Sequence, residues 1–237
     1  MEQQNIIVRV ATTHDKNYST IITDEMEASA KARGTGIAKR SPTYIEKKME
    51  EGKAVIAVMQ NGTWVGFCYI EAWGHGQFVA NSGLVVSPAF RKSGIAKLIK
   101  KRIFDLSREM YPDSKIFGLT TGLAVMKINS ELGYEPVTYS ELTDDEEFWA
   151  GCKSCVNYDI LVSKERKNCM CTAMLYDPKD HYTPEEMKED FHQYSKLYER
   201  FMKIKQSKLL KIFAKKDGNI SIPKVKINSI VQNFFNF

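Results

Sequence analysis

Hydrophobic positions recur along the chain with two different periods, and the shorter runs have the length of β-strands. Alternating or continuous runs of aliphatic and aromatic residues predict strands, because successive side chains point to opposite faces of a sheet. Strands are therefore expected at residues 6–10, 54–59, 63–70, 78–87, 115–121, 134–139 and 169–176.

Other stretches repeat their hydrophobic residues every three or four positions, which is the spacing of an amphipathic helix. Ser41 followed by Pro42 is typical of a helix N-terminus, and Gly133 is typical of the residue just past a helix. Helices are therefore expected at residues 18–32, 42–51, 95–108 and 123–132.

The order of these elements predicts the fold class. Asn61-Gly62 is the signal of a two-residue hairpin, and Gly74-His75-Gly76 marks a second turn. Hairpins pair strands antiparallel, whereas the helix at 95–108 connects two strands as a crossover. We expect an α/β (α+β) protein with a mixed, largely antiparallel sheet and helices on both faces.

The stretch GLVVSPAFRKSGIAKLIKK, at residues 83–101, carries the first chemical signal. A predicted strand ends near Pro88, and a basic amphipathic helix begins after Gly94. The turn between them holds small residues and positive charge. Because a helix N-terminus has unpaired N–H groups and a partial positive charge, this turn is expected to bind an anion.

Composition narrows the setting without naming a function. The chain has 237 residues, of which 43% are hydrophobic and 27% charged, as in ordinary globular proteins. No apolar run reaches the roughly 18 residues that a membrane span needs, and the N-terminus lacks the pattern of a signal peptide. Five cysteines in such a chain predict a reducing compartment, and we expect the cytoplasm.

Charge is distributed unevenly along the chain. Residues 1–178 contain 22 Lys and Arg against 22 Asp and Glu, whereas residues 179–237 contain 12 against 7. We therefore predict one domain at 1–178 and a basic helical C-terminal extension at 179–237.

The extension has an apolar face and a basic stretch. Thr183 and Pro184 begin a predicted helix, whose apolar face would pack on the domain or on a second copy of the chain in a homo-oligomer. Between Arg200 and Lys226 there are nine basic residues against one acidic residue. A solvated basic helix is the interpretation that we favour, and binding of nucleic acid or of an anionic membrane is the alternative.

The motif Arg91-x-x-Gly94-x-Ala96 resembles the Arg/Gln-x-x-Gly-x-Gly/Ala signature of the GNAT N-acetyltransferase superfamily, and the order of the surrounding elements matches as well. The resemblance implies the GNAT fold and acyl transfer from the thioester of acetyl-CoA to an amine. Main-chain N–H groups of the turn would hold the pyrophosphate, and one from the preceding strand would polarise the thioester carbonyl. The cofactor-binding residues so implied are Leu84, Val85, Val86, Arg91, Lys92, Ser93, Gly94, Ile95 and Ala96.

A closer resemblance lies further along the chain. The segment GLTTGLAVMKINSELGYEPV, followed by CKSCVNYDIL, is similar to the acyltransferase domain of N-acetylglutamate synthases, as is GIAKRSPTYIE at residues 36–46. The similarity covers roughly residues 8–176 and includes no amino-acid-kinase domain, which implies a stand-alone form. It implies transfer of an acetyl or succinyl group to the α-amine of L-glutamate, in arginine biosynthesis.

The same segments imply residues that would hold the carboxylates of the acceptor. Arg40 offers a guanidinium fork suited to bidentate binding, Lys39 and Lys153 offer point charges, and Ser154 offers a hydroxyl. The alternative is that all four are solvated surface residues, which is the usual position of charged side chains.

The groups that transfer protons are less well specified by the resemblance. A glutamate that is common early in the strand at 78–87 is replaced near Ala80, and a tyrosine that is common in the later helix aligns with Asn129. Glu71 and His75 are the candidate bases that remain nearby. We take Glu71, His75 and Asn129 as the candidate catalytic positions.

Four of the five cysteines form two close pairs, Cys152 with Cys155 and Cys169 with Cys171. Four thiolates at such spacings suit a structural tetrahedral zinc, whereas buried free thiols and a redox pair are the alternatives. Cys169 and Cys171 would face one side of a strand. Cys68 alternates within a predicted strand and is expected in the core.

Three function classes follow from these observations. We favour an N-acylglutamate synthase that takes a small amine as its partner and no nucleic acid. A GNAT acetyltransferase for another small amine or a peptide N-terminus is the second class. The third is a non-catalytic module that binds CoA or nucleic acid.

Overall fold

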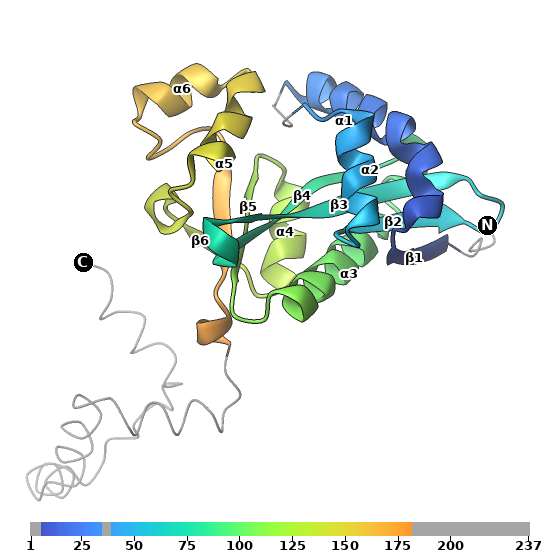
Figure 1. Ribbon diagram of the computed structural model, residues 1–237. Helices are drawn as coiled ribbons and strands as arrows, with labels where there is room; N and C mark the ends of the chain where they lie inside the picture. The colour runs from blue at the N-terminus through green and yellow to red at the C-terminus, as the bar shows by residue number, and fades with distance from the viewer. Residues whose placement is uncertain (1–5, 35–38, 182–237) are drawn as a thin grey trace, which may run out of the picture. The chain divides into compact units, whose positions relative to one another are not determined.

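The computed structural model describes residues 6–34 and 39–181, and within them seven strands form one sheet (Figure 1). The strands are β1 (Ile6–Val10), β2 (Ala54–Met59), β3 (Trp64–Trp73), β4 (Phe78–Val86), β5 (Lys115–Thr120), β6 (Glu135–Val137) and β7 (Thr172–Tyr176). They are ordered β1-β2-β3-β4-β5-β7-β6 across the sheet. Every neighbouring pair is antiparallel except β4 and β5, which are parallel.

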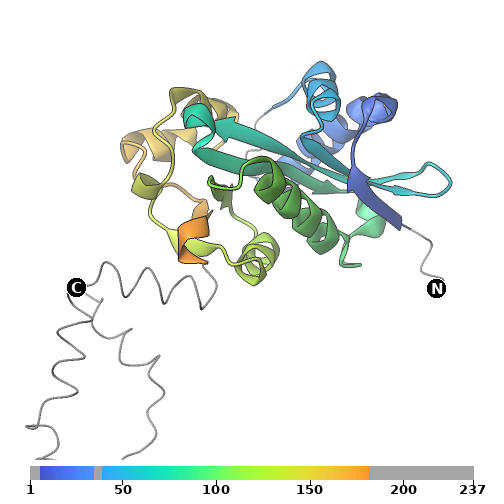
Figure 2. The same cartoon turned by 60° about the horizontal axis from the view of Figure 1, so that its bottom comes forward.

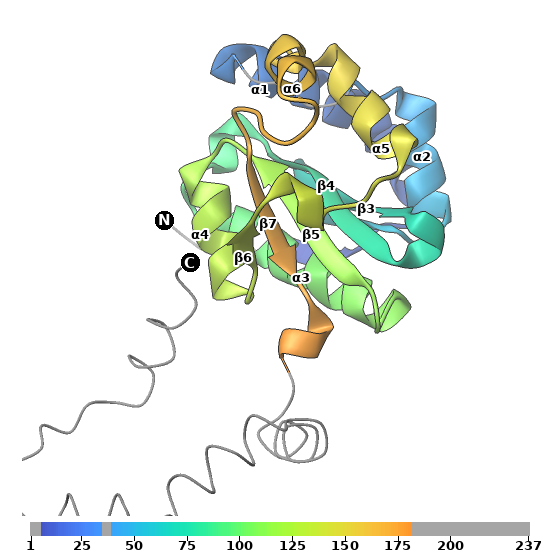
Figure 3. The same ribbon diagram turned by 90° about the vertical axis from the view of Figure 1, so that its left-hand side faces the viewer.

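Helices cover both faces of this sheet. One face carries α1 (Ser19–Arg33) and α2 (Pro42–Glu50) and, further along, α5 (Glu146–Ala150) and α6 (Tyr158–Ser163) (Figure 3). The opposite face carries α3 (Ile95–Met110) and α4 (Leu123–Glu131), and Figure 2 shows α3 lying across the strands. The predicted α/β fold, with a mixed, largely antiparallel sheet and helices on both faces, is therefore confirmed.

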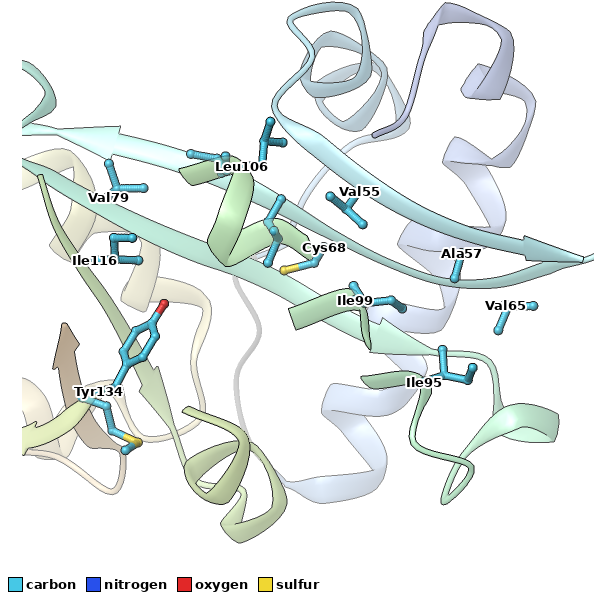
Figure 4. Packing of buried hydrophobic residues seen from close by; sticks show 13 residues of the cluster. Val55, Ala57, Val65, Cys68, Val79, Ile95, Ile99, Leu106, Ile116 and Tyr134 are labelled. Atoms are coloured by element: carbon cyan, nitrogen blue, oxygen red, sulfur yellow. The ribbon is translucent and has the colours of Figure 1, made fainter. Parts of the chain in front are cut away.

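Each face of the sheet has its own hydrophobic core, because alternate strand residues point to opposite sides. On the α3 face, Cys68 and Val55 are buried against Ile99 (Figure 4). On the α1 and α2 face, Phe67 is buried with Ile22. Fully burying one such side chain stabilises the fold by about 1.5–3 kcal/mol, so each helix is held mainly by its apolar stripe. The expected core position of Cys68 is confirmed.

The parallel strands β4 and β5 separate after a short common stretch. They pair from Phe78 to Ala80 and from Lys115 to Phe117. Beyond that point β4 continues against β3 as far as Val86, whereas β5 continues against β7. The edge of β4 that faces away from β3 therefore has no strand partner after Ala80, and its outward amide groups are available for other acceptors.

A bulge bends β4 in its unpaired half. Tyr69 is opposite Ser82 but Phe67 is opposite Val85, so β4 contains one residue more than β3 between these pairs. Gly83 lies in the bulge at φ +65°, a conformation that residues with a side chain rarely adopt. A Cβ atom there would lie 2.4 Å from the ring of Tyr69. The bulge thus requires glycine both for its backbone angle and for space.

The local helix signals are also confirmed, and a hairpin forms at Asn61-Gly62, but its loop covers residues 60–63 and is longer than the predicted two residues. The Ser41 hydroxyl accepts a hydrogen bond from the Tyr44 amide, with Pro42 at the first helical position. Gly133 follows α4 at φ +88°, where its lack of a side chain avoids strain.

The connection between β6 and β7 differs from expectation. The predicted strand at 169–176 begins only at Thr172, so Cys169 and Cys171 precede β7 and do not lie on a strand. The acidic stretch before it forms the short helix α5, and α6 follows, where no helix was predicted. Indole and leucine side chains explain both helices, because Trp149 and Leu161 are buried against β5 and β7.

The predicted extension at 179–237 falls outside the described residues from position 182 onward, and its helix at Thr183, its basic stretch and the boundary at 178 stay predictions. Among residues 6–34 and 39–181, no helix combines the length and the apolar character that crossing a bilayer requires.

Candidate active site

The turn between β4 and α3 presents unpaired backbone donors. Gly94 precedes α3 at φ +86°, and a Cβ atom built there would have no neighbour within 4 Å. Within the described part of the chain, the amides of Ser93, Gly94, Ile95 and Ala96 have no hydrogen-bond acceptor. These unpaired donors lie at the N-terminus of a 16-residue helix, with open space beside Gly94, which is an arrangement suited to binding phosphate.

The two basic residues of this turn point in different directions. Arg91 donates from Nε to the carbonyl of Val86 (3.0 Å) and from Nη2 to Glu25 and Ser29 of α1. Its charge is therefore already paired, and it fastens α1 to the turn. Lys92 is exposed at φ +61° and pairs with no acidic group among the residues described. Among the residues described, Lys92 is thus the basic side chain of this turn whose full positive charge is available to an anion.

Glu71 lies on the face of the sheet that carries α1 and α2. It is directly opposite Ala80 in the β3–β4 register, so both side chains point to the same face. Ala80 is the last β4 residue that pairs with β5, which places Glu71 beside the point where the two strands separate. A carboxyl group thus lies on the strand next to Ala80, at the same level of the sheet.

Two cations surround the Glu71 carboxylate. Lys48 of α2 donates to Oε2 at 2.8 Å, and Arg40 Nη2 lies 3.8 Å from Oε1. Arg40 also donates from Nε to the hydroxyl of Tyr69 (3.1 Å) and lies over the ring of Tyr44, 4.9 Å from its centroid. Both cations lie over the ring of Tyr44, and Arg40 also donates to the main-chain carbonyl of Lys39, so the cluster is built into the fold.

Burial controls the ionisation of this cluster. Glu71 is only 8% exposed, and burial raises its pKa to about 7, while the charge of Arg40 acts in the opposite direction. Burial likewise lowers the pKa of Lys48 and raises the pKa of the Tyr69 hydroxyl. A carboxyl group with a pKa near neutrality is suited to accept and release a proton at physiological pH.

The other two candidate catalytic positions lie elsewhere. His75 is exposed in the turn between β3 and β4, in a left-handed conformation at φ +54°. Asn129 is buried in α4, where its amide nitrogen lies 3.7 Å from the sulfur of Met174 and its Oδ1 has no partner among the described residues. The structure thus brings neither residue into the Glu71 cluster.

The four residues predicted to bind the carboxylates of the acceptor substrate also lie in different places. Arg40 is part of the Glu71 cluster, whereas Lys39 points to the surface and contacts Glu27 at 3.7 Å. Lys153 and Ser154 are exposed in the segment that follows α5, on the same face of the sheet as α2. Among these four residues, Arg40 is the one that meets a candidate base.

The four paired cysteines are partly buried, and their surroundings do not favour thiolates. Burial raises the pKa of Cys152 to about 11 and that of Cys171 to about 12. Within residues 6–34 and 39–181, no group of three or more His, Cys, Asp or Glu side chains is arranged to hold a metal. The predicted zinc site at Cys152, Cys155, Cys169 and Cys171 therefore receives no support from the described residues.

The site contains residues that the sequence analysis did not select. Lys48 and Tyr44 are one helical turn apart on α2, so both face the sheet, and Tyr69 precedes Glu71 by two positions on β3. The two-residue spacing of Tyr69 and Glu71, which places both side chains on one face of β3, was visible in the sequence. The contact with Lys48 was not, because it depends on how α2 packs over the strand.

Comparison with known proteins gives a family match for part of the chain. The family model described as "Acetyltransferase (GNAT) family" matches residues 24–122, from within α1 to just past β5. No curated protein matches the sequence.

Solved structures show the same fold at low sequence identity. The chain is similar to N-acetylglutamate synthase from Neisseria gonorrhoeae complexed with coenzyme A and N-acetyl-glutamate, with 17% identity and a TM-score of 0.52. That match covers 76% of this chain and 36% of the synthase chain. Rv2747 from Mycobacterium tuberculosis, in complex with CoA, has 18% identity and a TM-score of 0.51 over 72% of this chain and 98% of that chain.

A GNAT-family acetyltransferase from Staphylococcus aureus has 12% identity and a TM-score of 0.53, over 73% of this chain and 99% of that chain. The region matched by the family model contains the turn before α3, the separating strands and Glu71. Residues 24–122 of the chain therefore match the acetyltransferase (GNAT) family.

Proposed function

We propose that this protein is an N-acyltransferase that moves an acetyl group from acetyl-CoA to the α-amine of a small amino acid, with L-glutamate as the preferred acceptor. The observation that carries the proposal is the contact of buried Glu71 with Arg40 and Lys48 beside the opening between β4 and β5. A base and two cations at that place suit an acceptor that brings both an amine and carboxylates.

The donor half of the reaction rests on the turn before α3. The free amides of residues 93–96 suit the pyrophosphate of acetyl-CoA, and Lys92 adds a positive charge. The unpaired edge of β4, around Leu84, Val85 and Val86, suits the thioester end, where an outward amide would stabilise the developing oxyanion. Succinyl-CoA has the same recognition groups and is the alternative donor.

The acceptor half rests on the pairing of opposite charges. An α-amino acid carries its amine and its carboxylate on one carbon atom, so the two groups require a carboxylate and a cation side by side. Glu71 and Arg40, 3.8 Å apart, provide this arrangement. Arg40 would bind the α-carboxylate with its guanidinium fork, and Glu71 would face the amine.

The net charge of the cluster favours an acidic acceptor. Two cations, Arg40 and Lys48, surround one carboxylate, so the cluster is positive by one charge when all three groups are ionised. A second carboxylate on the acceptor would balance this charge. Glutamate meets the requirement, and its acetylation would place the protein at the acetylation step of arginine biosynthesis.

The chemical step follows from these positions. Glu71, with a pKa of about 7, takes the proton from the acceptor ammonium, so the neutral amine can attack the acyl carbon. Lys48 holds the carboxylate in place for this transfer. The carbon–nitrogen bond forms as the carbon–sulfur bond breaks.

A CoA-release assay with matched acceptors tests the proposal. We expect turnover with glutamate, weaker turnover with glutamine, and little with 4-aminobutyrate, which is glutamate without its α-carboxylate. Arg40→Ala should raise the KM for glutamate greatly and leave CoA binding intact, whereas Lys47→Ala, an exposed neighbour on α2, should change neither. Faster turnover with a peptide N-terminus or an uncharged amine would overturn glutamate as the acceptor. Unchanged kinetics for Arg40→Ala would remove that residue from the site.

A further inference from the structure

A buried lysine lies on the opposite face of the sheet from Glu71. Lys100 of α3 is 2% exposed. Its Nζ donates to Asn81 Oδ1 at 3.0 Å and to the hydroxyl of Tyr134 at 3.4 Å, and lies 4.9 Å from the centre of the Tyr134 ring. Tyr134, seen in Figure 4 among the core residues of this face, donates to the same Asn81 oxygen at 3.0 Å.

The positive charge of Lys100 has no anion beside it. All the groups within hydrogen-bonding distance of Nζ are neutral, and among the described residues it forms no ion pair. A lysine ammonium has three N–H donors, and the contacts with Asn81 and Tyr134 use two of them. An uncompensated buried charge is costly, so a transient anion at the third N–H would be strongly stabilised.

The position of Asn81 brings this cation to the opening between the strands. Asn81 is the first β4 residue after the last pair with β5, which is formed by Ala80. Consecutive strand residues point to opposite faces, so Ala80 lies on the face of Glu71 and Asn81 on the face of Lys100. A thioester threaded between β4 and β5 would therefore have the carboxyl group on one side and the ammonium on the other.

We propose that Lys100 is the general acid that protonates the sulfur of CoA as it leaves. The inference rests on the proposed acyl transfer. As the acceptor nitrogen bonds to the acyl carbon, the electron pair of the carbon–sulfur bond passes to sulfur, which takes a proton from Lys100 Nζ. Nitrogen loses two protons in all: Glu71 passes the ammonium proton to solvent before the attack and accepts the second proton as the amide forms. The products are an amide and the CoA thiol, and both side chains recover their protonation states by exchange with solvent.

The surrounding groups suit this role. Lys100 is faced by Cys68 of β3, by Tyr134 after α4 and by the neutral Asn81. Asn81 donates in turn to Ser107, and Tyr176 of β7 packs against the ring of Tyr134. Burial lowers the pKa of Lys100 to about 8, close to the ordinary thiol value of about 8.5. Burial raises the pKa of Tyr134 and raises that of Cys68 to about 11, so these two groups keep their protons there.

Binding of CoA, compared with desulfo-CoA, tests the inference without turnover. If the Lys100 ammonium lies beside the sulfur, the bound CoA thiol ionises more readily than the free thiol. Lowering the pKa of the bound thiol by one unit would raise the affinity of CoA relative to that of desulfo-CoA about threefold between about pH 6 and about pH 8. Calorimetry on the full chain should show this rise in the wild type and in the control Lys101→Met, which changes an exposed lysine of the same helix. Lys100→Met should abolish it.

Measurements of thermal stability and of reaction rate distinguish a general acid at Lys100 from a lysine with a purely structural role. Lys100→Met removes a buried charge while Tyr134 still donates to Asn81, so the melting temperature should not fall. The rate of acyl transfer should fall by about 10²–10⁴-fold, and the decline of kcat above about pH 8 should disappear.

The outcomes are distinct from those for the proposed function. A pH-independent affinity ratio in the wild type, a ratio unchanged in Lys100→Met, or no CoA binding would each overturn the role of Lys100. A loss of stability that parallels the loss of rate would do the same. Failure of glutamate as acceptor, with the affinity ratio as expected, would overturn the acceptor and leave Lys100 supported.

Discussion

At the scale of single residues, burial gives ordinary side chains their functional character. Glu71 and Lys100 would titrate far from neutrality in water, near about 4.3 and about 10.4. In the structure, burial raises the pKa of Glu71 to about 7 and lowers that of Lys100 to about 8. Because burial disfavours the charged form of each, the carboxyl and the amine approach neutral pH from opposite sides, as the base and the acid of one reaction require.

The pH dependence of activity tests Glu71. A base acts in its deprotonated form, so kcat/KM should rise with pH through about 7, before the decline above about pH 8 that an acid at Lys100 causes. Glu71→Gln keeps the shape of the side chain and removes the base, which should lower the rate of CoA release by about 10²–10⁴-fold. A Gln variant as fast as the wild type would show that the amine loses its proton to another group.

The contact with Lys48 predicts a shift of the same pH profile. Lys48 donates to the Glu71 carboxylate and stabilises its charged form. Lys48→Met should therefore move the rising part of the kcat/KM profile to higher pH, while Lys47→Met, at an exposed neighbouring position, should leave it in place. A profile that stays at the wild-type position in Lys48→Met would mean that the two groups do not interact during catalysis.

At the scale of elements, the decisive feature is the course of β4. It pairs with β5 for three residues only and then bends away through the bulge at Gly83. A regular strand would have continued the parallel pairing and closed the sheet. The separation of β4 from β5 and the unpaired β4 edge both follow from this departure.

Substitution of Gly83 tests whether the bulge needs glycine. In Gly83→Ala the new Cβ would lie 2.4 Å from the Tyr69 ring and 2.6 Å from Met26, at an unfavourable φ. In the control Gly52→Ala the φ is also positive, but no atom lies within 4 Å. We expect both variants to lose about 1–2 kcal/mol of unfolding free energy from the backbone and Gly83→Ala to lose about 1–3 kcal/mol more from overpacking. Equal denaturant midpoints for the two variants would contradict the close approach of Gly83 to Tyr69.

At the scale of the whole molecule, one sheet keeps the two proposed proton-transfer groups on opposite faces. Its two faces have separate hydrophobic cores, one under α3 and one under α1 and α2. Glu71 and Lys100 belong to different faces and therefore do not neutralise each other in the resting protein. They would act on the same bond only through a substrate that occupies the opening.

Ligand-induced stabilisation tests this arrangement in the full chain. A ligand that binds only the folded state at a hundred times its Kd raises the free energy of unfolding by about 2.7 kcal/mol. CoA should therefore raise the melting temperature, and Lys92→Ala should reduce the rise, because Lys92 is the unpaired charge of the turn among the residues described. Arg91→Gln should affect CoA less than Lys92→Ala, since Arg91 is already paired with Glu25. The reverse order would place Arg91 on the phosphates.

The sequence by itself determined the features that depend on neighbouring residues. The hairpin at Asn61-Gly62, the cap at Ser41 and the Gly94 turn could all be predicted, because each is decided by the backbone preferences and side chains of a few consecutive positions. The mixed sheet followed from the order of those elements, and the GNAT motif from their spacing. Arg40 was selected through resemblance, and its place beside Glu71 is seen in the structure.

Only the tertiary structure decided which residues meet. The Lys48–Glu71 contact joins α2 to β3, and the Lys100–Asn81 contact joins α3 to β4, across 23 and 19 residues of chain. Such contacts depend on register and on helix packing, which no local pattern encodes. The same holds for Cys169 and Cys171, whose expected strand began later because Trp149 and Leu161 cover the sheet there. Burial, which sets the pKa of both proposed proton-transfer groups, is a property of the folded chain alone.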